Sequence, residues 1–160
     1  MEKYIITVLS QNNPGVLSRI SSLLRRKMFN ISSLTVGQTD DVGLSRFTIV
    51  ALGNERQARK IARNIENLIE VLKVKIIPME RAVTREISLV KVQASSVQDS
   101  DSLFDFPDIS VTVNMHGAEE MELEVIDRGM ATESFMKYLE ANGVVVRKWV
   151  RSGIIAVEGE

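Results

Sequence analysis

The sequence contains no cysteine and a single histidine among its 160 residues. Without cysteine there can be no disulfides, thiolate zinc sites or cysteine nucleophiles, which fits a reducing compartment. The single histidine, His116, leaves no second imidazole for a metal site. No apolar run approaches the ~20 residues that a membrane helix needs, and residues 1–4 show no signal-peptide pattern. We therefore expect a cytoplasmic protein that does not span a membrane.

Aromatic residues are also scarce, at 5% of the chain against 44% hydrophobic residues overall. The core must therefore be built from isoleucine, valine and leucine. Charge is unevenly distributed: residues 1–80 carry 12 basic and 7 acidic residues, whereas residues 81–160 carry 8 and 14. Opposite net charges favour two structural units, although ordinary solvated surfaces would give the same asymmetry.

The first half of the chain alternates β-rich and helix-patterned segments. Strands are predicted at residues 4–9, 31–36, 44–52 and 71–77, and amphipathic helices at 16–24 and 58–69. Asn13 is predicted to cap the first helix, with Pro14 as its first residue, and Asn54 to cap the second. The order β-α-β-β-α-β predicts an α+β, ferredoxin-like unit over residues 1–78, with two helices covering one face of an antiparallel sheet.

The second half repeats this order in reduced form. A charged linker is predicted at residues 79–85, followed by a second ferredoxin-like unit over 86–160. A helix at residues 132–142 is expected to end at Gly143. Residues 96–108 contain Ser, Asp and Pro and offer at most one helical turn. Strands are predicted at residues 86–94, 109–113, 121–126, 144–150 and 154–157.

A search for catalytic or metal-binding chemistry finds little. His116 is interpreted as a surface or turn residue. The acidic group around residues 119–124 alternates with apolar residues as the solvent face of a strand would, with a divalent-ion or partner-binding patch as the alternative. The aspartates of residues 99–108 do not match a calcium loop, and no glycine-rich phosphate loop is present. We expect no catalytic residue and no metal site.

Nucleic-acid binding is not indicated either. Four basic residues gather on the first helix without any helix-turn-helix, zinc or aromatic RNA-binding signature, and they are interpreted as a solvated face: Arg19, Arg25, Arg26 and Lys27.

One loop does carry binding chemistry. Asn12, Gly15, Val16 and Leu17 lie where the first strand joins the first helix. The first amides of a helix lack partners within the helix and favour an anion such as a carboxylate. The Asn12 amide can both donate and accept hydrogen bonds. The loop could therefore hold both ends of a free amino acid, although a plain turn would use the same residues.

These residues also carry a resemblance to a known family. The loop at residues 12–19 (NNPGVLSR) resembles the ligand loop of ACT domains. Longer motifs resemble the small subunit of acetolactate synthase: residues 29–36 (FNISSLTV), 39–41 (TDD), 44–46 (LSR), 68–74 (LIEVLKV), 85–95 (REISLVKVQAS) and 151–156 (RSGIIA). The likeness is nearly continuous over residues 2–95 and patchy in the last third of the chain.

The resemblance implies a non-catalytic regulatory subunit. Family members bind the thiamine-diphosphate-dependent catalytic subunit, raise its activity and let valine inhibit it. It implies an ACT domain at 1–78 that binds the effector and forms a homodimer, and a C-terminal small-subunit domain at 86–160. Thiamine diphosphate, Mg and FAD are expected on the catalytic subunit and no cofactor on this chain. Valine is the expected effector, with leucine or isoleucine as alternatives.

The resemblance also implies the site residues. Asn12, Gly15, Val16 and, by position, Leu17 match one wall of the effector site, and Asn30 and Ile31 match the wall that a second protomer supplies. Asn30 could instead be a turn residue with a left-handed backbone. The short segment at 96–108 departs from the family, which usually has a helix there. A stand-alone ACT sensor, or a small enzyme using the acidic C-terminal half, remain as alternatives.

Overall fold

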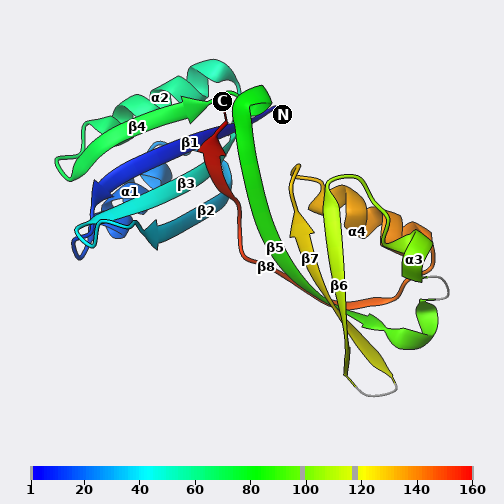
Figure 1. Cartoon of the computed structure of the whole chain (residues 1–160). Helices are drawn as coiled ribbons and strands as arrows, with labels where there is room; N and C mark the ends of the chain where they lie inside the picture. Colours follow the sequence, from blue (N-terminus) through cyan, green and yellow to red (C-terminus); the bar gives the residue numbers. More distant parts are fainter. Residues whose placement is uncertain (1, 98–99, 117–118, 160) are drawn as a thin grey trace. The chain divides into compact units, whose positions relative to one another are not determined.

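The computed structural model describes residues 2–97, 100–116 and 119–159 (Figure 1). The chain forms two compact units, one running to Val83 and including the segment from Ile154 onward, the other spanning Thr84–Gly153. This division falls within the predicted linker at 79–85, but these residues are not irregular: residues 79–81 form one 3-10 turn and Ala82 begins strand β5 (Ala82–Gln93). The alternation of buried and exposed side chains from Thr84 onward marks these residues as strand rather than linker.

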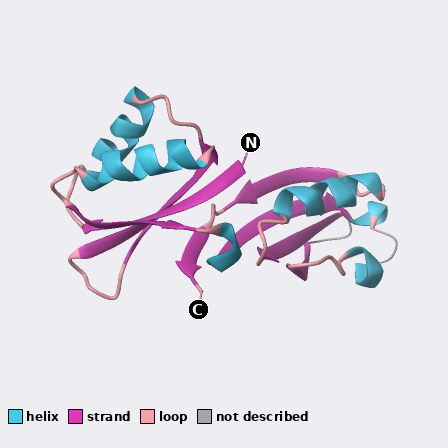
Figure 2. Ribbon diagram, turned by 90° about the horizontal axis from the view of Figure 1, so that it is seen from above, coloured by secondary structure: helices cyan, strands magenta, loops and turns pink. Residues whose placement is uncertain are grey.

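The first unit has the predicted element order. It consists of β1 (Glu2–Gln11), α1 (Val16–Arg26), β2 (Ile31–Gln38), β3 (Leu44–Gly53), α2 (Glu55–Glu66) and β4 (Val71–Ile77). The strands pair antiparallel in the order β2-β3-β1-β4. Both helices lie on one face of this sheet (Figure 2). Their apolar stripes pack on Ile6, Val8, Phe47 and Ile49 and form a core made mostly of aliphatic side chains.

Helix α2 begins as predicted and ends earlier. The Asn54 side chain accepts from the Gln57 amide at 2.9 Å, and the Gln57 side chain accepts from the Asn54 amide at 2.9 Å, which is a reciprocal capping box. The helix stops at Glu66, so the predicted continuation of its stripe to Ile69 is wrong. Ile69 is 87% exposed and lies in the turn before β4.

The face of the first sheet opposite the helices is partly covered by the end of the chain. Ile154 donates its amide to the Ser33 hydroxyl at 3.0 Å and accepts from the Thr35 hydroxyl at 2.8 Å. Strand β9 (Ile155–Glu158) follows and contacts β1. The sequence predicted this strand and assigned it to the second unit. By its contacts the segment from Ile154 onward belongs to the first unit, although β9 itself pairs with β5.

The second unit confirms the reduced copy. After β5 come short turns at Ala94–Ser96 and α3 (Ser100–Leu103), then β6 (Ile109–His116), β7 (Glu120–Asp127), α4 (Thr132–Ala141) and β8 (Val146–Arg151). The order β6-β7-β5-β8 matches that of the first sheet. The first helix has shrunk to the four residues of α3, as the composition of residues 96–108 predicts. Gly143 follows α4 with a left-handed φ of 82°, as expected for the end of a helix.

The acidic residues of β7 occupy the positions that alternation predicts. Leu123 and Val125 are buried, while Glu122 and Glu124 are on the opposite side of the strand and half-exposed. Within residues 2–97, 100–116 and 119–159, no three His, Asp or Glu side chains gather as a metal site would require. In the same ranges no helix is long and apolar enough to cross a membrane. His116 is the last residue of β6, and its side chain lies outside what the structure describes.

A buried polar cluster joins three strands of the second unit to the start of α4. Asp127 accepts from the Gly129 amide at 2.8 Å and from both the amide and the hydroxyl of Thr132, at 2.6 and 2.5 Å. Glu86, only 3% exposed, makes a two-pronged ion pair with Arg151, with Nε–Oε1 at 3.0 Å and Nη2–Oε2 at 2.7 Å. The Thr132 hydroxyl also approaches Glu86 at 3.3 Å, so the two carboxylates belong to one network.

We predict that Asp127→Asn destabilises the protein by about 2 kcal/mol at pH 7, because the new amide nitrogen faces the donors of Thr132. Burial alone would raise the pKa of Asp127, but hydrogen bonds from Thr132 and Gly129 outweigh it and lower the pKa below its ordinary value of 3.8. A lowered folded-state pKa gives a stabilisation that is complete above the unfolded pKa and is lost as pH falls through the folded pKa.

Urea unfolding at pH 7 and pH 3 checks this prediction. The difference in free energy of unfolding between the wild type and Asp127→Asn should be smaller at pH 3. A difference that stays constant between the two pH values would mean that the Asp127 charge does not supply the stabilisation.

Candidate functional site

The loop between β1 and α1 is shaped by one glycine. Gly15 has a left-handed φ of 90° and immediately precedes Val16, the first residue of α1. No side chain caps this helix, so the predicted roles of Asn13 as N-cap and Pro14 as first helical residue are wrong. The left-handed turn at Gly15 delays the helix by two residues, a conformation that costs non-glycine residues roughly 1–2 kcal/mol.

Most backbone amides of the loop are available to bind a ligand, because the first amides of a helix have no acceptor within the helix. Those of Gly15 and Leu17 donate to no acceptor among the described residues, whereas the Val16 amide lies 3.4 Å from the Asn13 carbonyl. A Cβ built on Gly15 would meet nothing within 4 Å, so the space beside this backbone is open. Val16 is buried at 4% exposure and Leu17 is 45% exposed. Val16 can therefore reach a ligand only through its backbone, and Leu17 can do so through its side chain.

Two segments distant in sequence hold this loop in place. The Asn12 amide donates to the Gly43 carbonyl at 2.8 Å, and Asn12 Nδ2 donates to the Val42 carbonyl at 3.3 Å. The Gln11 amide donates to the Glu70 carbonyl at 2.8 Å, and the Glu70 carboxylate pairs with Arg19 of α1. The turn between β2 and β3 and the turn before β4 thus position the loop.

Among the described residues, Asn12 is the one loop side chain that hydrogen-bonds to a residue distant in sequence. With Nδ2 engaged by Val42, its Oδ1 has no partner among the described residues and can accept from an ammonium group. The neighbouring Asn13 bonds only to the Gln11 side chain, at 2.9 Å. The sequence gives no signal that the turn at residues 40–43 supports Asn12.

Asn30 and Ile31 lie at the other end of α1. Ile31 opens β2 and packs half-buried against the core, and the Asn30 carbonyl accepts from the Leu52 amide at 2.9 Å. The left-handed residue in this turn is Met28, with φ 54°, and Asn30 is not among the residues with positive φ. The alternative interpretation of Asn30 as a left-handed turn residue is therefore wrong.

The two predicted walls are too far apart to close around one small ligand within a protomer. They are separated by the 11 residues of α1, about 16 Å at 1.5 Å per residue. The strand register agrees, because Gln11 pairs with Leu44 at one end of β3 while Ile31 pairs with Ala51 near the other. The described contacts thus bring Asn12, Gly15, Val16 and Leu17 together and leave Asn30 and Ile31 apart.

Strand β2, which carries Ile31, is an edge of the first sheet. Its side chains are all exposed or half-exposed. An edge strand presents unpaired backbone donors and acceptors that another strand can use. This edge therefore offers backbone groups with which a further strand could pair.

A βαββαβ sheet with an open helix-start loop at its first strand–helix junction is the arrangement of an ACT domain, and the comparisons agree. The family model described as "AHAS small subunit-like ACT domain" matches residues 6–73. A protein of Mycolicibacterium smegmatis named "Acetolactate synthase small subunit" is 31% identical over 159 residues, covering 96% of this chain and 89% of the relative. The crystal structure of the acetolactate synthase small subunit from Thermotoga maritima superposes with a TM-score of 0.83 at 29% identity, covering 100% and 99% of the two chains.

A "Probable acetolactate synthase small subunit" of Methanothermobacter thermautotrophicus is 35% identical over 108 residues, which is 68% of this chain. The match spans 64% of that relative's length. The chain is thus an ACT-domain protein. It belongs to the acetolactate synthase small-subunit family.

Proposed function

We propose that this chain is the regulatory subunit of acetolactate synthase. It binds the thiamine-diphosphate-dependent catalytic subunit, raises its activity and confers feedback inhibition by valine in branched-chain amino acid biosynthesis. Thiamine diphosphate, Mg and FAD would reside on the catalytic subunit, and this chain would contribute no catalytic residue. The strongest support is the likeness to small subunits along nearly the whole chain, including the reduced second unit.

The effector site is proposed between two protomers. Gly15 and Leu17 of one protomer offer free amides to the valine carboxylate, where the start of α1 favours negative charge. Asn12 Oδ1 accepts from the valine ammonium group. Asn30 and Ile31 of the second protomer close the site, because within one protomer they lie at the far end of α1. A symmetric dimer formed along β2 would contain two such sites.

The regulatory effect follows from linkage. Valine can change the activity of the catalytic subunit only by as much as its affinity differs between two arrangements of the assembly, typically 1–3 kcal/mol. Ligation at a site shared by two protomers favours one relative arrangement of those protomers. Leucine and isoleucine share the carboxylate and ammonium groups of valine and remain alternative effectors.

The competing function is that of a stand-alone ACT sensor acting on another partner. Its support is the N-terminal unit alone, which has a complete loop and edge strand. Size-exclusion chromatography with light-scattering detection, run on a mixture with the acetolactate synthase catalytic subunit, distinguishes the two proposals. The regulatory subunit should elute with the catalytic subunit in one complex, whereas a sensor for another system should elute apart from it at micromolar concentrations.

A further inference from the structure

On the face of the first sheet opposite α1 and α2, paired residues of β3, β1 and β4 form three rows of side chains across the strands. The register places Val50, Ile5 and Ile77 in one row, Thr48, Thr7 and Lys75 in the next, and Arg46, Leu9 and Lys73 in the third. The first row is almost fully buried and apolar. The chain end covers this face only in part, so the third row keeps two exposed cationic side chains on either side of a leucine.

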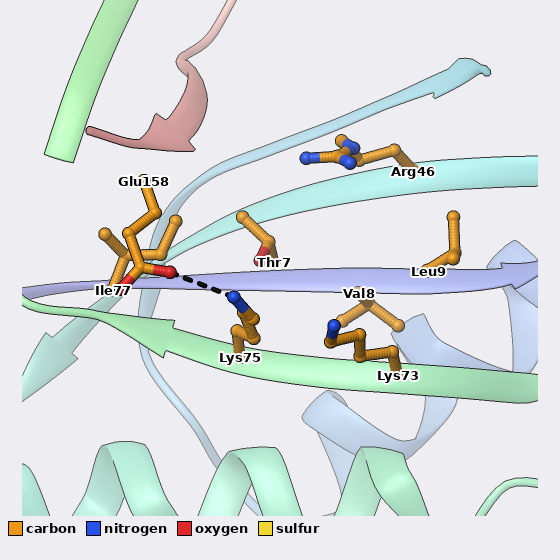
Figure 3. Close-up of a pocket in the computed structure, with 8 residues that line it drawn as sticks. All are labelled: Thr7, Val8, Leu9, Arg46, Lys73, Lys75, Ile77 and Glu158. Carbon is orange, nitrogen blue, oxygen red and sulfur yellow. Dashed lines mark hydrogen bonds and ion pairs between the residues drawn. The ribbon is translucent and has the colours of Figure 1, made fainter. Parts of the chain in front are cut away.

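A cavity of about 220 Å³ lies over the second and third rows. Figure 3 shows the side chains of Arg46, Lys73 and Lys75 on the same face of the sheet as Thr7 and Leu9 of β1. Glu158 of β9 reaches in from the chain end and pairs with Lys75 at 2.9 Å. The lining therefore combines a small apolar floor with a threonine hydroxyl and three cations.

The charges of this cavity are not balanced by the chain. Three basic side chains face one carboxylate, which leaves a net charge of about +2 in the lining. Neither Arg46 nor Lys73 makes a side-chain hydrogen bond or ion pair with any described residue. Adjacent strands lie about 4.8 Å apart, so cations on β3 and β4 flank β1 closely enough to act on one ligand.

We propose that this cavity binds a small oxyanion, a carboxylate or a phosphate group, between Arg46 of β3 and Lys73 and Lys75 of β4. The Arg46 guanidinium offers paired donors to two oxygens of the anion, and the lysines add point charges. The cavity is smaller than the ~300–1,000 Å³ of typical drug-sized pockets, which favours a small ligand.

Glu158 acts in this site as an internal competitor. Its carboxylate already accepts a hydrogen bond from Lys75, one of the three cations, as an oxygen of the ligand would. An incoming anion must share or displace it, so binding is coupled to the position of the chain end on the sheet. This site lies on the sheet face opposite α1 and α2, and it does not depend on the proposed valine site or on the catalytic subunit.

The test is an NMR titration of the whole chain with inorganic phosphate and, separately, with succinate at constant ionic strength. Saturable shifts should gather at the backbone amides of Thr7, Leu9, Arg46 and Lys73. Arg46→Ala and Lys73→Ala should each weaken binding at least about fivefold, and Glu158→Gln should tighten it about threefold or more. Lys60→Ala removes one positive charge from α2 on the other face and should change affinity less than twofold.

The two anions distinguish the source of the ligand chemistry, since tighter binding of one assigns the site to phosphates or to carboxylates. Shifts that do not saturate would overturn the proposal. Equal affinities for Arg46→Ala and Lys60→Ala would also overturn it, because the effect would then be one of net charge. Unchanged binding by Glu158→Gln would overturn the competition by the chain end.

Discussion

Replacing Asn12 with alanine is expected to abolish inhibition by valine while leaving stimulation of the catalytic subunit intact. Asn12 Oδ1 is the loop acceptor proposed for the valine ammonium group, and a hydrogen bond to a charged group is worth roughly 1.5–3 kcal/mol. The concentration of valine that gives half-inhibition should therefore rise by about 10- to 100-fold, so that valine concentrations that inhibit the wild type leave the variant almost uninhibited. The effect should stay local, because Asn12 is exposed and its side chain makes a single hydrogen bond to the described residues, to the Val42 carbonyl.

The matched control is Asn13→Ala. Asn13 is the adjacent asparagine, also exposed, and its side chain bonds only to Gln11. This variant should keep the valine response of the wild type. Full inhibition of Asn12→Ala at the same valine concentration would show that the assigned site is wrong, and an equal loss in both variants would point to a general disturbance of the loop.

The second large effect is expected in the second unit, from Arg151→Met. This change leaves the Glu86 carboxylate, 3% exposed, without its two-pronged partner, and methionine preserves much of the side-chain volume over Trp149. Removing one partner of a buried ion pair typically costs 3–5 kcal/mol. We expect a loss of about 3 kcal/mol in the free energy of unfolding, the lower end of that range, because Arg151 itself reaches solvent.

Denaturant unfolding of Arg151→Met and Lys148→Met compares the replacement of one cationic side chain by methionine at two positions of β8. Lys148 is exposed and forms no ion pair with a described residue, so its replacement should change stability by less than about 0.5 kcal/mol. Similar losses in both variants would show that the Glu86–Arg151 pair adds little. The double change Glu86→Leu with Arg151→Met should recover part of the loss, since no buried charge then stands alone.

The fold of each unit could be predicted because local patterns specify it. The aliphatic stripe on α1 and the Asn54 N-cap are signals within a few residues, and both helices formed where expected, with their ends shifted. The end of α2 was missed because Leu68 and Ile69 fit a helical period, while the chain turns after Glu66 toward β4. A period identifies a face, and it does not say where the backbone leaves the helix.

Long-range placement could not be predicted. Residues 154–157 have a clear β pattern, yet that pattern does not show that Ile154 bonds to Ser33 and Thr35 or that the strand pairs with β5. The division between the units falls within the predicted linker at 79–85, but strand β5 already begins at Ala82, because charged residues are equally compatible with a strand that has one exposed face. Nothing local links Glu70 to Arg19, or the Asp40–Gly43 turn to Asn12.

In the candidate site, too, local features could be predicted from the sequence and long-range ones could not. The availability of the Gly15 and Leu17 amides could be inferred from their position at a helix start. The left-handed backbone of Gly15 and the contact of the Val16 amide with the Asn13 carbonyl could not be predicted from the sequence and are seen only in the structure. The assignment of Asn30 and Ile31 came from family resemblance alone. Their separation from the loop by the length of α1 now gives that assignment a physical requirement, a second protomer.

The most direct measurement is acetolactate formation by the catalytic subunit, with and without this protein, across a valine titration. The proposed function predicts that the protein raises the rate and that valine reverses the increase. Stimulation without any response to valine would retain the partner and reject the proposed effector site or its ligand. A rate of acetolactate formation that does not change when this protein is added would contradict the proposal that the chain is the regulatory subunit of this enzyme.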